Sequence, residues 1–297
     1  IVRSPGIWLP VNARNAPEEN VNILAHGGCE FLFLHSRFAD QLPQLRAALP
    51  ALKGIVCIDA TIGEVADQAN HADPSDRPDP PDAAAVPSLE QWAAGQSAEP
   101  YRSGAGPDDV VAIRGTGGTT GLPKGVLITH RNYAMLFANW YAAMPVTARP
   151  VHLIVAPLTH AAGAVAFATC GYGGANVVLP TAEPGAIIDA IRRYRVTQLF
   201  LPPTAIYKLL GHPGVRDGDY SSLRYFVYSA APMSVDRLRD ALDIFGPVMV
   251  QAYGQAEAPF VCTVMTTHDH ARCLADQLVR AEHPRQCIDQ AGFLGDA

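Results

Sequence analysis

Residues 197–252 have the sequence TQLFLPPTAIYKLLGHPGVRDGDYSSLRYFVYSAAPMSVDRLRDALDIFGPVMVQA. Short runs of β-branched and aromatic residues alternate here with longer stretches whose apolar residues recur at helical spacing. The predicted elements are strand 197–201, helix 204–210, strand 224–228, helix 235–245 and strand 248–252. Such alternation is typical of a parallel sheet whose strands are joined by helical crossovers. Ser234 stands where its hydroxyl would cap the helix that follows it.

The same alternation extends toward the N-terminus. Further strands are predicted at 55–58, 110–113, 125–129, 152–156 and 176–179, and further helices at 132–144 and 184–194. In the second of these helices Ile187, Ile188 and Ile191 share one face. The chain is therefore expected to be an α/β protein with twisted, largely parallel β-sheets flanked by helices.

Composition excludes several functional classes. The 297 residues carry a formal net charge of −6 without a block of basic residues, which argues against a nucleic-acid partner. No apolar run reaches the roughly 18 residues that a membrane-spanning helix needs. The six cysteines show no paired spacing. We therefore expect free thiols and a cytoplasmic location.

A loop rich in glycine and threonine carries the clearest chemical signal. Its residues are Thr116, Gly117, Gly118, Thr119, Thr120, Gly121, Leu122, Pro123, Lys124 and Gly125. Glycines let the backbone approach a ligand, successive N–H groups form an anion-binding nest, and Lys124 adds a cation. The loop is not a Walker A motif, because a proline precedes Lys124 and a predicted strand follows. A polyphosphate site is indicated; a plain glycine-rich hairpin is the alternative.

This loop resembles the signature T-[SG]-G-[ST]-T-G-x-P-K-G of the adenylate-forming superfamily, which includes acyl- and aryl-CoA synthetases. Other segments resemble family motifs in the expected order. They are Pro10–Arg14 (P-l-N-x-r), Pro157–Gly163 (P-L-x-H-x-x-G), Leu201–Thr204 (v-P-P-t), Ser229–Met233 (G-[AG]-A-P-[LM]) and Gln251–Glu257 (Y-G-x-T-E). Gly115 departs from the family pattern because it replaces an aromatic residue, and Ala256 departs because it replaces a threonine whose hydroxyl holds phosphate.

The resemblance implies the large N-terminal domain of this superfamily and a role for each motif. The phosphates of ATP would contact Thr116, Gly117, Gly118, Thr119, Thr120, Gly121 and Lys124. The adenine site would comprise Ala231, Pro232, Tyr253 and Gly254. Glu257 and Thr119 would bind Mg²⁺, Lys124 and Glu257 would act in catalysis, and His160 and Gly163 would line the pocket for the acyl group.

The implied activity is the ATP-dependent conversion of a carboxylic acid to acyl-AMP and then acyl-CoA. The preferred substrate class is a fatty acid. The partners would be the acid, ATP and CoA. An amino-acid adenylation domain is an alternative, although P-L-x-H-x-x-G favours acyl and aryl ligases. A remnant that only binds nucleotide is the other alternative, supported by Ala256.

The resemblance also leads us to expect a partial AMP-binding domain over 1–266 and an atypical tail over 267–297. We expect the C-terminal catalytic subdomain to be absent, so that the enzyme would be impaired. A frameshift, a deletion or a pseudogene would explain the tail.

Two smaller expectations concern the loop and the tail. Without ligand, the loop 115–125 should be mobile because it has few apolar side chains to anchor it. The tail contains several residues of metal-ligating types: His268, His270, Cys273, His283 and Cys287. Their spacing matches no standard zinc module. Scattered polar residues are therefore the preferred interpretation over a zinc site.

Overall fold

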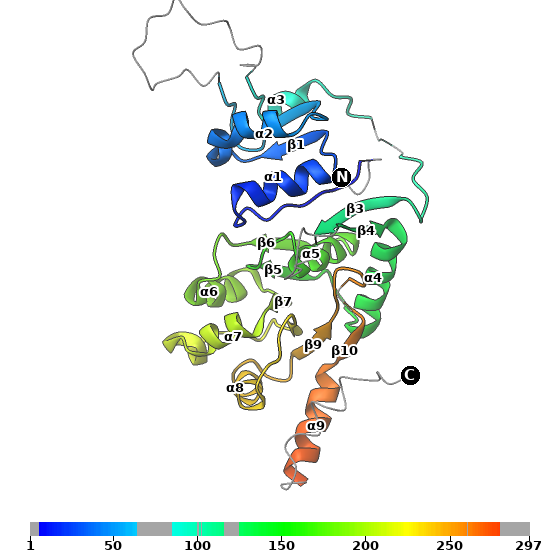
Figure 1. Cartoon of the computed structure of the whole chain (residues 1–297). Helices are drawn as coiled ribbons and strands as arrows, with labels where there is room; N and C mark the ends of the chain where they lie inside the picture. Colours follow the sequence, from blue (N-terminus) through cyan, green and yellow to red (C-terminus); the bar gives the residue numbers. More distant parts are fainter. Residues whose placement is uncertain are drawn as a thin grey trace, which may run out of the picture. The chain divides into compact units, whose positions relative to one another are not determined.

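The computed structural model describes residues 6–63, 85–99, 101, 103–115, 125–259 and 261–279. The chain divides into two compact units, one formed by residues 1–105 with 111–125 and the other by residues 106–110 with 126–297. Figure 1 shows the elements of both units in chain order.

The first unit contains a short parallel strand pair with helices beside it. Its elements are α1 (Pro17–His26), β1 (Phe31–Leu34), the 3-10 helix η1 (Ser36–Gln41), α2 (Leu42–Ala48), β2 (Gly54–Cys57), α3 (Leu89–Ala94) and most of β3 (Val110–Gly115). β1 and β2 pair in parallel, with Phe31 opposite Gly54. The core of this unit comprises Val21, Leu24, Leu32, Leu34, Leu42, Leu45, Leu49, Cys57 and Val86.

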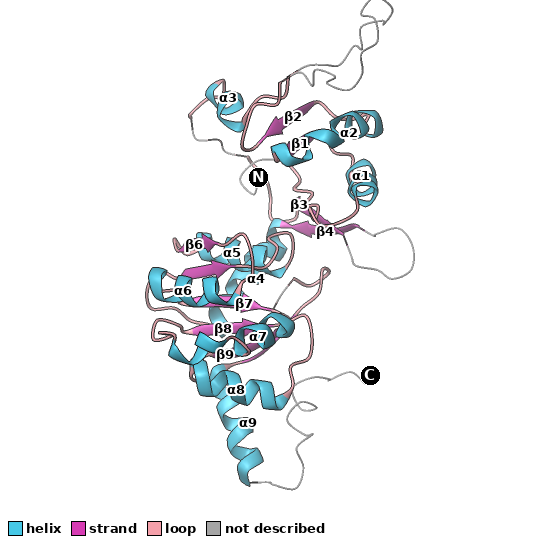
Figure 2. Ribbon diagram, turned by 90° about the vertical axis from the view of Figure 1, so that its left-hand side faces the viewer, coloured by secondary structure: helices cyan, strands magenta, loops and turns pink. Residues whose placement is uncertain are grey.

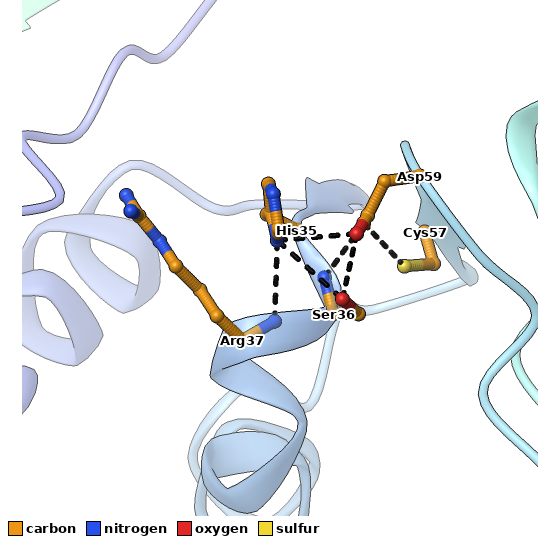
Figure 3. A network of polar contacts seen from close by, with 5 residues as sticks. All are labelled: His35, Ser36, Arg37, Cys57 and Asp59. Atoms are coloured by element: carbon orange, nitrogen blue, oxygen red, sulfur yellow. Dashed lines mark hydrogen bonds and ion pairs between the residues drawn. The ribbon is translucent and has the colours of Figure 1, made fainter. Parts of the chain in front are cut away.

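Asp59 joins the ends of β1 and β2 (Figure 3). Its carboxylate accepts hydrogen bonds from the Ser36 backbone N–H at 2.8 Å and from the Ser36 hydroxyl at 2.6 Å. Cys57 Sγ lies 3.2 Å and His35 Nδ1 3.3 Å from the same carboxylate. These hydrogen bonds, those from Ser36 first, lower the pKa of Asp59 to about 2. The carboxylate therefore stays charged and anchors the start of η1.

The second unit is built on a six-stranded sheet (Figure 2). Its strands are β5 (Val151–Ile154), β6 (Ala175–Val178), β7 (Gln198–Leu201), β8 (Tyr225–Tyr228), β9 (Met249–Tyr253) and β10 (Thr263–Met265). The order across the sheet is β10-β9-β8-β7-β5-β6. All pairs are parallel except β10 with β9. The predicted α/β class with a largely parallel sheet is confirmed.

Helices cover both faces of this sheet (Figure 1). The helices are α4 (His130–Ala143), α5 (Ala161–Gly171), α6 (Pro184–Tyr194), α7 (Pro203–Leu210), α8 (Val235–Phe245) and α9 (Thr267–Val279). α6, α7 and α8 pack on one face, where they enclose an extended apolar cluster. α5 packs on the opposite face, with α4 beside it. We call these the α7 face and the α5 face.

Capping explains where several helices begin. Ser234 accepts a hydrogen bond from the Arg237 N–H at 3.4 Å and starts α8, which confirms the predicted cap. Thr129 and Asn132 form a reciprocal capping box at the start of α4. Thr266 and Asp269 exchange similar hydrogen bonds at the start of α9.

Two helices of the second unit lie where the sequence analysis predicted none. α5 was missed because its alanine- and glycine-rich sequence is apolar on nearly every side and shows no amphipathic period. α9 occupies the first part of the tail whose structure the sequence left open, whereas 280–297 lie outside the described residues.

Candidate nucleotide site

The strand order places a topological switch point between β5 and β7. From β5 the chain moves outward to β6, and it then returns to β7 on the other side of β5. Open α/β sheets bind ligands outside the carboxyl ends of their strands, at such a point. The segments that follow β5 and β7 are therefore the first place to look for a site.

Four of the motifs found in the sequence occupy this edge of the sheet. Residues 157–163 follow β5, residues 202–204 follow β7, residues 229–233 follow β8, and residues 253–257 end β9. Because these strands are adjacent and parallel, their carboxyl ends share one edge. The fold thus gathers segments that are up to a hundred residues apart in sequence.

The segment after β5 turns tightly into α5. The His160 N–H donates to the Pro157 carbonyl at 3.1 Å, and the Gly163 N–H donates to the His160 carbonyl at 3.0 Å. A Cβ on Gly163 would lie 1.9 Å from the Leu158 carbonyl oxygen, so only glycine fits. Gly163 is buried, whereas His160 is exposed and its side chain makes no capping hydrogen bond. Gly163 therefore shapes the turn, and His160 is the residue available to a ligand.

The segment after β8 leaves the sheet through a strained residue. Ala230 has φ +71°, in the left-handed region that non-glycine residues occupy at a cost of about 1 kcal/mol or more. Ser229 and Met233 are buried, but Ala231 and Pro232 are exposed between them. The Ser234 N–H donates to Tyr207 Oη at 2.9 Å and anchors the end of the turn on α7. The turn presents backbone and small side chains to solvent.

The segment after β9 presents an aromatic ring and a carboxylate. Tyr253 is 55% exposed although it still pairs with Thr263 of β10. The turn that follows is closed by a Gln255 N–H to Ala258 carbonyl bond of 3.1 Å, and Glu257 is exposed. An exposed tyrosine at a strand end can stack on a base, and a free carboxylate can bind a hard cation that also holds phosphate oxygens. Gly254 lies between Tyr253 and the turn that carries Glu257.

The Gly/Thr loop itself lies outside the described residues. This concerns Thr116, Gly117, Gly118, Thr119, Thr120, Gly121 and Lys124. The flanking structure agrees with the sequence: β3 ends at Gly115, and β4 (Gly125–Thr129) begins directly after the loop. The prediction that the loop links two strands rather than a strand and a helix is confirmed.

The metal alternative in the tail finds no support in the described part of α9. His270 is buried and uses both ring nitrogens for hydrogen bonds to Tyr228 and Thr266. Among the described residues, no group of three or more His, Cys, Asp or Glu side chains is arranged to hold a metal ion. His283 and Cys287 lie outside them.

Sequence reasoning missed a row of polar side chains beneath the site. Asn176, His152, Gln198 and Tyr225 are register partners across β6, β5, β7 and β8, so their side chains share the α5 face. Asn176 Nδ2 donates to the Ala166 carbonyl at 3.1 Å, and its Oδ1 lies 3.1 Å from His152 Nδ1. The register that aligns these residues is not visible in a single sequence.

The ends of two side chains in this row have no hydrogen-bond partner among the described residues. Gln198 Nε2 donates to Thr169 Oγ1 at 2.6 Å, which leaves Gln198 Oε1 unpaired. His152 Nδ1 donates to Asn176 Oδ1, so His152 Nε2 is an unpaired acceptor. Burial lowers the pKa of His152 to about 4, against a partial opposing effect of Asn176. His152 is therefore neutral at physiological pH.

A largely parallel α/β sheet with several sequence motifs at its switch-point edge is typical of nucleotide-binding α/β proteins. The chain belongs to the AMP-binding enzyme family, whose model matches residues 1–280. This match runs past residue 266, where the sequence analysis had ended the domain.

Curated relatives of the chain are CoA ligases. It is 38% identical over 164 residues to the medium/long-chain fatty-acid–CoA ligase FadD8 of Mycobacterium tuberculosis, covering 55% of this chain and 29% of that protein. It is 34% identical to a second M. tuberculosis ligase, which acts on a methyl-dioxo-octahydroindenyl propanoyl group; 90% of this chain and 50% of that protein are covered. A feruloyl-CoA synthase of Amycolatopsis is 31% identical over 86% of this chain and 50% of its own. The chain thus spans about half the length of the latter two relatives, and less of the first.

Solved structures agree with the fold. The amide bond synthetase McbA of Marinactinospora thermotolerans matches with a TM-score of 0.71 at 25% identity, over 91% of this chain and 50% of that one. The N-terminal domain of FACL13 from M. tuberculosis matches with a TM-score of 0.71 at 21% identity, over 90% and 61%. The described part of the chain contains no helix with the length and apolar character to cross a membrane.

Proposed function

We propose that this chain carries the nucleotide- and acid-binding part of an enzyme that activates a carboxylic acid with ATP. The observation that carries this proposal is the order of the motifs: each follows its own strand, and four adjacent strands bring them to one edge. Membership of the AMP-binding family and the three CoA-ligase relatives support it.

The proposed reaction has two steps. A carboxylate oxygen attacks the α-phosphorus of Mg²⁺-bound ATP, the bond from that phosphorus to the pyrophosphate oxygen breaks, and acyl-AMP forms. The thiolate of CoA then attacks the acyl carbonyl, and AMP leaves. The protein's part in the first step is to position the groups and neutralise charge.

Roles for the described residues follow from their exposure. Tyr253 stacks on adenine, and the exposed backbone of Ala231 and Pro232 packs against it. The exposed Glu257 carboxylate would hold Mg²⁺, which would neutralise phosphate charge when bound. His160 contacts the acyl carboxylate at the start of α5. Thr119 and Lys124 of the Gly/Thr loop are proposed for Mg²⁺ and the phosphates on the motif alone.

The acid is proposed to be a fatty or aromatic acid, because the relatives include a fatty-acid ligase and a feruloyl-CoA synthase. One observation favours a second candidate, a protein that binds nucleotide without turnover. Ala256 has no hydroxyl to hold the adenylate phosphate. Losing a donor aimed at developing charge removes about 3 kcal/mol of transition-state stabilisation.

Both candidate functions require nucleotide binding. Titration calorimetry with AMP and with Mg-ATP tests this requirement. We expect both nucleotides to bind and Tyr253→Ala to weaken both. Lys124→Ala and Glu257→Gln should weaken Mg-ATP more than AMP, because they act on the phosphates and the metal. Lys53→Ala removes an exposed lysine paired with Glu30 and serves as the charge-matched control.

Absence of binding at millimolar nucleotide would contradict both candidates. Pyrophosphate release with fatty and aromatic acids then separates an enzyme from a binding protein. If Ala256 is the cause of weak turnover, Ala256→Thr should raise it.

A further inference from the structure

A buried histidine–tyrosine pair joins α9 to the strand that leads into the adenine-binding turn. His270 and Tyr228 are 1% and 2% exposed, and His270 Nε2 lies 2.9 Å from Tyr228 Oη. The other ring nitrogen, Nδ1, lies 2.7 Å from the Thr266 carbonyl oxygen. Both polar ends of the imidazole are therefore engaged.

The directions of these hydrogen bonds follow from the chemistry of the partners. A carbonyl oxygen only accepts, so Nδ1 carries the proton that it donates to Thr266. In the neutral ring Nε2 is then an acceptor, and the Tyr228 hydroxyl donates to it. The single hydroxyl proton of Tyr228 is then used in the bond to His270. It is not available to the other acceptor near this hydroxyl, Gln251 Oε1, which lies 3.4 Å away.

A proton on Nε2 would reverse this order. The charged ring would donate to Tyr228 Oη, and the tyrosine would have to turn its own proton toward Gln251. The pair thus has one arrangement for the neutral ring and another for the charged ring.

The position of the pair links it to two proposed ligand segments. Tyr228 is the last residue of β8 and directly precedes the 229–232 turn. Gln251 is its register partner on β9, two residues before Tyr253. Thr266 directly follows β10, the strand that receives the chain after the Tyr253–Glu257 segment. The His270–Tyr228 contact therefore holds together the strands that carry the 229–232 turn and the Tyr253–Glu257 segment, the two sides of the proposed adenine site.

We propose that His270 is a positioning residue for nucleotide binding, which acts through Tyr228 to hold the 229–232 turn and the Tyr253 segment in register. This rests on the proposed function. It adds a residue of α9 that touches no substrate. It also makes nucleotide affinity depend on pH, because charging His270 reverses its hydrogen bond with Tyr228.

The charged groups around the pair are compatible with a neutral ring at physiological pH. Asp269 is adjacent, but its carboxylate accepts from the Thr266 N–H and hydroxyl and faces Arg272 at 3.6 Å. The other titratable neighbours are Tyr207 of α7, near Tyr228, and His268 on α9. Burial is the largest influence on His270 and lowers its pKa, against opposing effects of Thr266 and Asp269.

The test measures AMP affinity of the full chain by calorimetry, together with its unfolding midpoint in urea. At pH 7.5 we expect His270→Ala and Tyr228→Phe to weaken AMP binding about tenfold, the effect of one lost buried hydrogen bond. His270→Gln keeps an acceptor for the Tyr228 hydroxyl but cannot take up a proton. It should retain most of the affinity and lose the decline in affinity that we expect for wild type as the pH falls below 6.5, because burial lowers the pKa of His270 from that value.

His268→Ala and His268→Gln are the matched controls, because His268 is an exposed histidine on the same helix. They should leave both the affinity and its pH dependence unchanged. If His270→Ala and Tyr228→Phe lower the unfolding midpoint but leave AMP affinity within about twofold, the pair is structural only and the inference is wrong. If wild type itself binds no AMP, the proposed function fails instead.

Discussion

The two faces of the six-stranded sheet are built on different principles. On the α7 face Leu153, Leu199, Phe226 and Met249 point into an apolar cluster with side chains of α6, α7 and α8. On the α5 face their immediate neighbours His152, Gln198 and Tyr225 form a polar row, which makes hydrogen bonds to α5 and to the segment that follows α4. One strand therefore contributes to both environments with successive residues.

The two faces therefore have different roles. The apolar α7 face stabilises the fold, and the polar α5 face determines how α5 is placed on the sheet. Apolar contacts on the α7 face are non-directional, and their contribution grows with the area buried. The polar row is directional: Asn176 donates to the Ala166 carbonyl and to Cys170 Sγ, which allows only one placement of α5 along the sheet. Because His160 is the N-cap residue of α5, the placement of the helix also decides where its proposed ligand-facing end lies.

The largest expected effect is on the α7 face. Leu199→Ala should lower the free energy of unfolding by about 2–5 kcal/mol, because the side chain is 1% exposed and its removal leaves a cavity. Urea denaturation measures the loss. Leu127→Ala, a strand leucine that is 60% exposed, is the matched control and should cost well under 1 kcal/mol. Equal losses would mean that the α7 face does not carry the stability.

A smaller effect, limited to acid pH, is expected on the α5 face. His152 is fully buried with a pKa of about 4, whereas an unfolded histidine titrates near 6.5. Between these values the unfolded state binds more protons, so stability falls as pH decreases from 6.5 to 4 and is constant above. The full loss from this group is about 3 kcal/mol.

His152→Asn keeps a donor for Asn176 but does not titrate. Urea denaturation at pH 7.5, 5.5 and 4.5 should therefore show a shallower acid decline for the variant than for wild type. Parallel pH profiles would show that the row is not the source of acid sensitivity. His270 contributes to both profiles equally and cancels in the difference.

The smallest expected effect is on a buried polar side chain of the α5 face, whose loss should leave the free energy of unfolding nearly unchanged or raise it. Gln198→Met removes one hydrogen bond to Thr169 and one buried acceptor without a partner among the described residues. Thr169 keeps its bond to the Val165 carbonyl at 2.8 Å. We expect the free energy of unfolding to stay within about 1 kcal/mol of wild type or to rise. If Gln198→Met lowered the free energy of unfolding as much as Leu199→Ala, the two faces would not differ in their contribution to stability.

The sequence predicted the parts of the fold that follow from local pattern. All the strands of the sheet were placed within two residues except β10, which has only three residues. α6 and α8 were placed at their observed bounds, since each has one apolar face and α8 has a serine cap. The α5 helix lacked such a face. In the first unit the four-residue strand β1 and the helices α1, α2 and α3 also escaped prediction.

The candidate site was predictable only as motifs. Each motif could be read in sequence, but their meeting at one edge depends on strand order. The polar row and the His270–Tyr228 pair depend on register and on contacts between residues 42 positions apart, which no local pattern records. The loop residues, Lys124 among them, stay predictions.

The contact between Gly163 and the Leu158 carbonyl sets a limit on how this enzyme family member can diversify. A substitution at 163 would push the helix away from the turn and so displace His160, the residue proposed to contact the acid. A change in the proposed acid specificity would therefore have to come from neighbouring residues that can change size without moving the backbone. In a saturation library of residues 157–163, selection for folding alone would retain glycine at 163, and only selection for a substrate would act on the exposed His160.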